Sequence, residues 1–93
     1  MVEIYRTDQQ VLSTLDDIQE GCWINMVDPT NKEIEQIAKR FEIEPEDIAS
    51  ALDEEESSRI SLEDGYTVIL VDIPTPEVRH EKKMYTTIPL GII

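Results

Sequence analysis

The sequence contains few cysteines and glycines and no long apolar run. Its single cysteine, Cys22, cannot form an internal disulfide, which excludes a small secreted scaffold held together by disulfides. Its three glycines, Gly21, Gly65 and Gly91, lie too far apart to form a phosphate-binding loop. No window approaches the ~18 apolar residues of a transmembrane helix, and the first residues lack the apolar segment of a secretory signal. We therefore expect a soluble, cytoplasmic chain.

The charge of the chain is strongly biased to one sign. The 93 residues include 8 Lys and Arg against 21 Asp and Glu, which gives a net charge of −13 at pH 7. Binding to nucleic acid or to an anionic membrane surface needs clustered Lys and Arg, so the composition disfavours both partners. Divalent cations and basic proteins remain as partners that such a chain would attract.

The first part of the sequence is expected to form short strands. Val2 and Ile4 share one face of a predicted strand over residues 2–6, and the apolar run over 22–27 predicts a second strand. Residues 13–19 are interpreted as a helical turn.

Two helices are predicted after these strands. Thr30 followed by Glu33 is a capping box, in which each side chain satisfies a free backbone N–H group of the other residue. The apolar residues of the first helix recur at helical spacing and predict one buried stripe, made of Ile34, Ile37, Ala38 and Phe41. Pro45 suits the first turn of a second, shorter helix, whose inward residues are expected to be Ile48, Ala51 and Leu52.

A hairpin is predicted next. Residues 59–63 alternate with period two, Asp64-Gly65 follows, and residues 66–73 form an apolar strand. Two such runs separated by Asp-Gly favour a β-hairpin, with Ile60 and Leu62 facing the core. Residues 74–84 are interpreted as a polar connection, and residues 85–93 as a last strand.

These elements define the expected fold class. Strands, two helices and further strands predict an α/β sandwich fragment with a mixed sheet of about four to five strands, two helices and the Asp-Gly hairpin. Residues 1–93 are expected to form a single domain. Natural termini are usually polar, so the apolar end at Ile92 and Ile93 predicts the N-terminal part of a larger cytoplasmic domain, truncated within a strand.

Few residues could support catalysis. The single histidine, His80, lies in the expected polar connection, where a solvated side chain is the favoured interpretation over a general base. Cys22 has no nearby cation in the sequence to lower its pKa, so we interpret it as a small core residue and not as a nucleophile. The sequence therefore predicts that the chain is not an enzyme.

The densest charged feature is an acidic tract. It consists of Asp53, Glu54, Glu55 and Glu56. Carboxylates are ligands for hard cations such as Mg²⁺, but consecutive carboxylates point in different directions. We favour a solvated acidic surface, with these four residues as weak metal-ligand candidates. No cofactor is expected to bind tightly.

Eight residues follow one another in a characteristic order, and they are Trp23, Asn25, Pro29, Thr30, Glu33, Pro45, Arg59 and Tyr66. This order resembles that of a known family, the CorA-type magnesium transporters, in their N-terminal cytoplasmic domain. The resemblance continues through the segments YTVILVDIP and TTIPLGII and spans most of residues 22–93.

This resemblance implies an α/β/α sandwich on the cytoplasmic side of the cell membrane, within a homopentameric channel gated by intracellular Mg²⁺. The stalk helix, the membrane-spanning helices and the Gly-Met-Asn signature of the family do not occur in the sequence, so it implies no transport by this chain alone. Some members carry a Glu-Asp pair on the second helix that helps to hold the regulatory Mg²⁺. Ala49 and Ser50 occupy these positions here, which puts metal sensing at that site in doubt.

Two functions remain open at this point. One is a regulatory and assembly domain fragment of a CorA-like divalent cation transporter. The alternative is a free-standing acidic interaction module that binds a basic partner.

Overall fold

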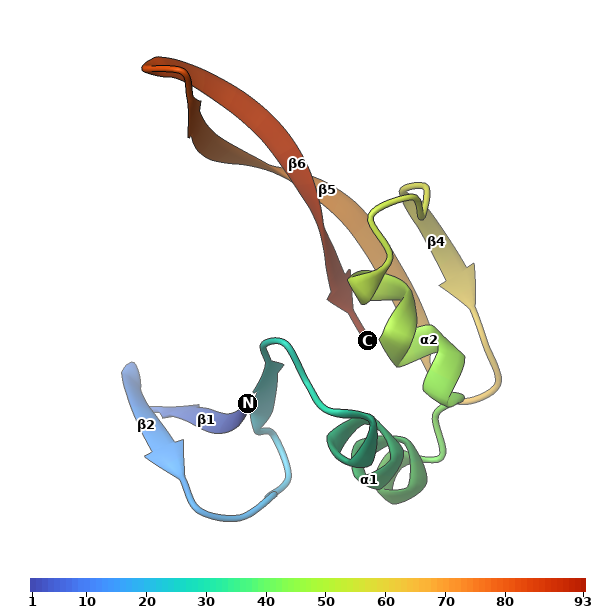
Figure 1. Ribbon diagram of the computed structural model, residues 1–93. Helices are drawn as coiled ribbons and strands as arrows, with labels where there is room; N and C mark the ends of the chain where they lie inside the picture. Colours follow the sequence, from blue (N-terminus) through green and yellow to red (C-terminus); the bar gives the residue numbers. More distant parts are fainter. The chain divides into compact units, whose positions relative to one another are not determined.

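The computed structural model describes the backbone of residues 1–93 and the side chains of all but residues 78, 79 and 83. The chain divides into two compact units, Met1–Gln36 and Ile37–Ile93. Each unit contains one three-stranded antiparallel sheet (Figure 1). The expected single mixed sheet of four to five strands is therefore wrong, because the strands before and after the helices pair among themselves.

The first unit is built on a sheet of order β2-β1-β3. Its strands are β1 (Val2–Asp8), β2 (Val11–Leu15) and β3 (Trp23–Met26). The register places Ile4 opposite both Leu15 and Ile24. One face of the sheet is thus aliphatic, as the alternation of Val2 and Ile4 predicts.

The helical turn expected over 13–19 is wrong, since its first residues belong to β2. Gln9 and Gln10 connect β1 to β2 and both have positive φ, 49° and 68°. A two-residue connection with two positive φ angles matches the twist of a hairpin. The sequence does not predict this turn, because Gln-Gln lacks the glycine that usually marks a two-residue hairpin connection.

Helix α1 (Asn31–Phe41) begins at the predicted capping box. Ile34 and Ala38 are buried, with 6% and 4% of their surface exposed, whereas Phe41 is 41% exposed. The predicted stripe is therefore buried only in its first part. Glu42 adopts a positive φ of 55° and Ile43 N–H donates to the Ala38 carbonyl over 2.9 Å, so the helix ends at Phe41.

The second predicted helix is present but short. It consists of α2 (Pro45–Ala49) and a single 3₁₀ turn, η1 (Ser50–Leu52). Pro45 is the first helical residue, where its missing N–H costs no hydrogen bond. Ile48 is buried, whereas Leu52 is 50% exposed and does not point inward as expected.

The second unit is built on a sheet of order β4-β5-β6. Its strands are β4 (Arg59–Leu62), β5 (Thr67–Arg79) and β6 (Lys82–Ile92). β4 and β5 pair antiparallel, with Leu62 opposite Thr67 and with Glu63 N–H bonded to the Tyr66 carbonyl. Between Glu63 and Tyr66 lie Asp64 and Gly65, and of these two only Gly65 has a positive φ, +87°.

The polar connection expected over 74–84 is wrong as well. β5 and β6 continue as a paired ribbon to a two-residue turn at His80 and Glu81, which have positive φ angles of 51° and 63°. Pro74 and Pro76 lie beyond Leu70, the last β5 residue that β4 pairs. Their missing N–H groups therefore fall on an edge, where a strand tolerates proline.

One face of the β4-β5-β6 sheet holds the core of this unit. Val68 and Leu70 are fully or almost fully buried there, at 0% and 3% exposure. η1 lies against the same face, since a Cβ on Gly91 would be 2.8 Å from the Ala51 Cβ. Ile60 and Leu62 lie on the opposite face, 72% and 83% exposed. The expectation that both face the core is wrong.

Candidate functional site

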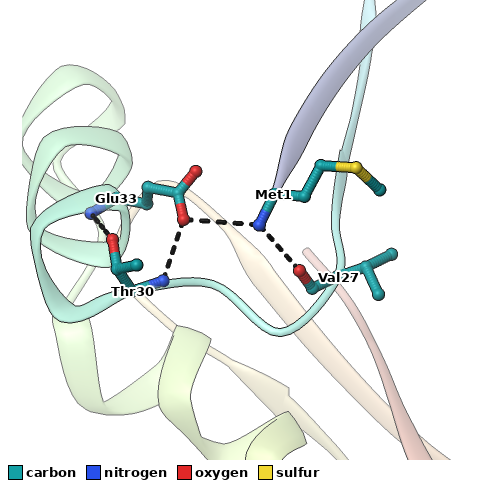
Figure 2. A network of polar contacts seen from close by, with 4 residues as sticks. All are labelled: Met1, Val27, Thr30 and Glu33. Atoms are coloured by element: carbon teal, nitrogen blue, oxygen red, sulfur yellow. Dashed lines mark hydrogen bonds and ion pairs between the residues drawn. The ribbon is translucent and has the colours of Figure 1, made fainter.

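The capping box of α1 is part of a larger polar network, drawn in Figure 2. Thr30 N–H donates to Glu33 Oε1 over 2.9 Å, and Glu33 N–H donates to Thr30 Oγ1 over 3.1 Å. The Met1 amino group lies 3.4 Å from the same Glu33 oxygen and donates to the Val27 carbonyl over 2.8 Å. The network thus connects the start of β1 to the start of α1 within the first unit.

This network stabilises the charged form of Glu33. The hydrogen bond from Thr30 N–H, together with the Met1 amino group, lowers the pKa of Glu33 below its ordinary value. A lowered pKa means that the ionised carboxylate contributes to folding above the ordinary glutamate pKa, roughly 4.3. The contribution is lost as the pH falls through the lowered pKa of the folded state.

We predict that Glu33→Gln makes the stability of the protein less sensitive to acid. The wild-type chain should melt at a higher temperature than the variant at pH 7, and the difference should shrink as the pH falls below about 4. Thermal melts between pH 3 and pH 7 measure it. Glu35→Gln, on an exposed position of the same helix, is the matched control. A difference that is constant across this range would show that the charge of Glu33 plays no part.

In the second unit, Tyr66 joins α2 to the connection between β4 and β5. Its hydroxyl donates to the Asp47 carboxylate and accepts a hydrogen bond from Glu44 N–H over 3.1 Å. The bond to Asp47 is the main reason why the pKa of Tyr66 is raised. Sequence reasoning missed Asp47 and Glu44, because they lie about twenty residues from Tyr66 and share no motif with it.

Arg59 forms a second link in the same unit. Its Nε lies 3.2 Å from Glu56 Oε1, and its Nη2 lies 3.5 Å from Ser50 Oγ. The Ser50 hydroxyl in turn donates to the Glu46 carbonyl over 2.8 Å. Arg59 therefore connects β4 to η1 and to the acidic tract.

The other residues of the resemblance occupy positions at the ends or edges of elements. Trp23 begins β3, is 60% exposed, and has its ring centroid 5.6 Å from that of Tyr5. Asn25 lies on the same strand, opposite Glu3 of β1. Pro29 is half-buried just before α1, and Pro45 begins α2. The residues of the resemblance are therefore divided between the two units.

The carboxylates of the acidic tract are exposed or bonded to neighbouring groups of the chain. Asp53, Glu54 and Glu55 are exposed, Asp53 accepts a hydrogen bond from Glu55 N–H over 3.0 Å, and Glu56 is paired with Arg59. Throughout the part of the chain that the structure describes, no three His, Cys, Asp or Glu side chains converge as metal ligands would. Mg²⁺ needs near-octahedral oxygen geometry, so metal binding by these four residues stays a prediction.

The comparison with known proteins identifies the family. The family described as CorA-like Mg²⁺ transporter protein matches residues 18–93. The chain belongs to the CorA-like Mg²⁺ transporter family. The resemblance seen in its sequence is thereby confirmed, and the match gives no support to a free-standing acidic interaction module.

A solved CorA structure shares the fold. The CorA magnesium transporter from Methanocaldococcus jannaschii superimposes with a TM-score of 0.68 at 22% sequence identity. The match covers 99% of this chain but only 29% of that transporter. No curated protein sequence matches the chain. No helix within the described residues has the length and apolar character needed to cross a bilayer.

The second helix of this CorA-like chain does not fit a regulatory Mg²⁺ site of the kind that the resemblance implies. Ala49 and Ser50 provide no carboxylate, and the Ser50 hydroxyl is already bonded to the Glu46 carbonyl. The Arg59 guanidinium lies 3.5 Å from Ser50 Oγ and places a positive charge beside this position. Like charges this close repel, so the position disfavours a divalent cation.

Proposed function

We propose that this chain is part of the cytoplasmic regulatory and assembly domain of a CorA-like divalent cation transporter, with no transport or catalysis of its own. The observation that carries the proposal is the family match over residues 18–93. The shared fold with the Methanocaldococcus jannaschii transporter supports it. The 29% of that transporter which the chain covers is consistent with a domain that acts on a pore built from other segments.

The proposal also includes place and partners. The parent protein would be a homopentamer, with this domain on the cytoplasmic side of the membrane. The transported divalent cation, Mg²⁺ by family membership, would be its ligand. The α/β/α arrangement implied by the resemblance belongs to the same proposal, since η1 lies against one face of the β4-β5-β6 sheet and aliphatic residues of the other face are exposed.

A chimera tests the proposal. In it, the matched segment of the Methanocaldococcus jannaschii transporter is replaced by this chain, and Mg²⁺ uptake is followed in cells that lack their own Mg²⁺ transporters. We expect an assembled transporter that conducts Mg²⁺. The control chimera carries an unrelated α/β domain of the same length and should not assemble. A chimera that reaches the membrane but assembles no better than this control would contradict an assembly role.

Regulation is tested in the same chimera. Because Ala49 and Ser50 lack carboxylates, inhibition by Mg²⁺ on the cytoplasmic side should require a higher concentration than in the parent. Restoring the acidic pair, with Ala49→Glu and Ser50→Asp, should shift inhibition back toward the parent. If the two chimeras respond to Mg²⁺ identically, the second helix has no regulatory part.

We predict that the chain binds Mg²⁺ only weakly. A net charge of −13 attracts divalent cations diffusely, and exposed charges are largely screened at physiological salt. Calorimetry at about 0.15 M salt should show a dissociation constant in the millimolar range or weaker, with little preference over Ca²⁺. Asp53→Asn and the control Asp17→Asn, which removes an exposed charge from the first unit, should reduce binding equally. A saturable micromolar isotherm that only Asp53→Asn abolishes would establish the acidic tract as a real site.

A further inference from the structure

The connection between β4 and β5 contains the only aspartate of the chain that a glycine follows, Asp64. The other aspartates are followed by a residue with a side chain, and they are Asp8, Asp16, Asp17, Asp28, Asp47, Asp53 and Asp72. Gly65 has no Cβ, so no side chain on that residue hinders the approach of the Asp64 carboxyl group to the Gly65 backbone nitrogen. The connection therefore places a carboxyl group next to an unhindered amide.

The structure leaves both groups free to react. Asp64 and Gly65 are exposed, and within the described part of the chain neither the Asp64 carboxylate nor the Gly65 N–H has a hydrogen-bond or ion-pair partner. A Cβ on Gly65 would meet no atom within 4 Å beyond its two chain neighbours, which leaves space around the amide. The flanking residues are fixed, since Glu63 N–H donates to the Tyr66 carbonyl over 2.9 Å.

We propose that Asp64 is a site of spontaneous covalent modification, at which the chain converts aspartate to isoaspartate. The Gly65 nitrogen attacks Cγ of the neutral Asp64 carboxyl group and an N–Cγ bond forms. One water molecule leaves, made of the amide hydrogen and the carboxyl OH, and a cyclic succinimide remains.

Water then reopens the succinimide in one of two ways. Attack at Cγ restores the aspartate. Attack at the backbone carbonyl carbon of Asp64 breaks the bond from that carbon to the Gly65 nitrogen, so the chain stays linked through Cγ and the backbone carbonyl becomes a free carboxylate. The water lost in the first step is regained in the second, so the reaction is an isomerisation and needs no oxidant, reductant or further reactant.

The isomerised linkage alters a connection that holds α2. A link through Cγ adds one carbon, Cβ, to the main chain between Glu63 and Tyr66, so the short connection no longer fits the hydrogen bond between these two residues. The Tyr66 hydroxyl donates to Asp47 and accepts a hydrogen bond from Glu44 N–H. Isomerisation at Asp64 therefore loosens the attachment of α2 to the connection. The inference concerns the chemistry of this chain and does not rest on the proposed function.

Peptide mapping of the aged protein tests the modification. The chain is kept at physiological temperature and neutral pH for several weeks and digested with trypsin, and the peptide of residues 60–79 is isolated. This peptide contains Asp64 and also Asp72, which an isoleucine follows, so electron-based fragmentation assigns any isoaspartate to one of the two. We expect isoaspartate at Asp64 and none at Asp72, with a transient form lighter by one water molecule. An aged chain without isoaspartate at Asp64 would overturn the proposal.

Two variants at the same position separate this chemistry from other causes of ageing. Asp64→Glu keeps the negative charge, but its longer side chain must close a larger ring, so the isomerised peptide should be lost. Asp64→Asn releases ammonia, which leaves an amide more readily than water leaves a carboxyl group at neutral pH, so isoaspartate should form faster than in the wild type. Isomerisation that is equally slow in Asp64→Asn would show that the Gly65 nitrogen does not reach the side chain, and would overturn the proposal.

An unfolded control tests the part that the structure plays. Because Asp64 and Gly65 are exposed and unbonded, the folded chain should isomerise within about tenfold of the rate in guanidinium chloride, which is a difference below about 1.4 kcal/mol in the activation barrier. Isomerisation confined to guanidinium chloride would show that the folded connection protects Asp64, and would overturn the proposal.

Thermal melts test the effect on α2. The isomerised fraction, separated by chromatography, should melt at a lower temperature than the fresh chain, whereas aged and fresh Asp64→Glu should melt alike. An isomerised fraction that melts at the same temperature as the fresh chain would overturn the loosening of α2.

Discussion

Leu70→Ala should lower the free energy of unfolding by about 2–4 kcal/mol, the range typical of truncating a buried leucine. Leu70 is 3% exposed, beside Val68, which is completely buried. Its side chain lies on the face of the β4-β5-β6 sheet that also carries Gly91, and its Cδ2 would be 3.5 Å from a Cβ at that position. Removing the side chain of Leu70 opens a cavity in a small core, and a chain of this size has little stability to lose.

Leu62→Ala is the matched control, because it makes the same chemical change on the other face of the sheet. Leu62 is 83% exposed, so the expected loss is below about 0.5 kcal/mol. Both variants are compared by urea denaturation at a protein concentration low enough to keep the chain monomeric. If Leu62→Ala and Leu70→Ala lower the free energy of unfolding equally, the core does not lie on the face of Leu70 in preference to the face of Leu62.

The contrast between these two leucines shows what the sequence could and could not predict. Period-two alternation over 59–63 correctly indicates a strand, but it defines two faces without saying which one is covered. In the structure Arg59 turns toward η1, where it meets Glu56 and Ser50. Ile60 and Leu62 are therefore directed to the opposite face. Arg59 shares its face with the buried residues Val68 and Leu70, and the alternation over 59–63 does not report which face holds them.

Local signals with their own hydrogen-bond chemistry were reliable. The capping box at Thr30 and Glu33 is present as predicted, and Pro45 begins a helix. Turns without a glycine were missed, because Gln9-Gln10 and His80-Glu81 adopt positive φ angles that side chains other than glycine usually disfavour. Their strands were misinterpreted as a result.

The candidate site was less predictable than the fold. Asp53 to Glu56 are clustered in the sequence, yet Glu56 is engaged with Arg59 and Asp53 with backbone. The residues of the family resemblance pointed to the right family, while the structure gives Thr30, Glu33 and Tyr66 roles in holding elements together. The resemblance therefore reports shared architecture more directly than shared chemistry.

The packing of η1 on β6 leads to the second large prediction. Gly91→Val should lower the free energy of unfolding by about 1–3 kcal/mol, because the added side chain overpacks this contact. Gly91 does not have a positive φ, so a side chain is excluded there by space and not by backbone conformation. Its added Cβ would lie 2.8 Å from the Ala51 Cβ, closer than two carbon atoms can approach. The valine must therefore push η1 away from the sheet that it covers.

A double-mutant cycle shows whether this contact is the cause. Gly91→Ala introduces the clashing Cβ alone, and Ala51→Gly removes the atom that it meets. The double variant should lose less stability than the sum of the two single variants, with a coupling of at least about 0.5 kcal/mol, as expected for residues in contact. The measurement is the free energy of unfolding of all four proteins. Strict additivity would show that η1 does not pack on β6 at Gly91, and Leu70 would then lack the cover on which its own predicted loss depends.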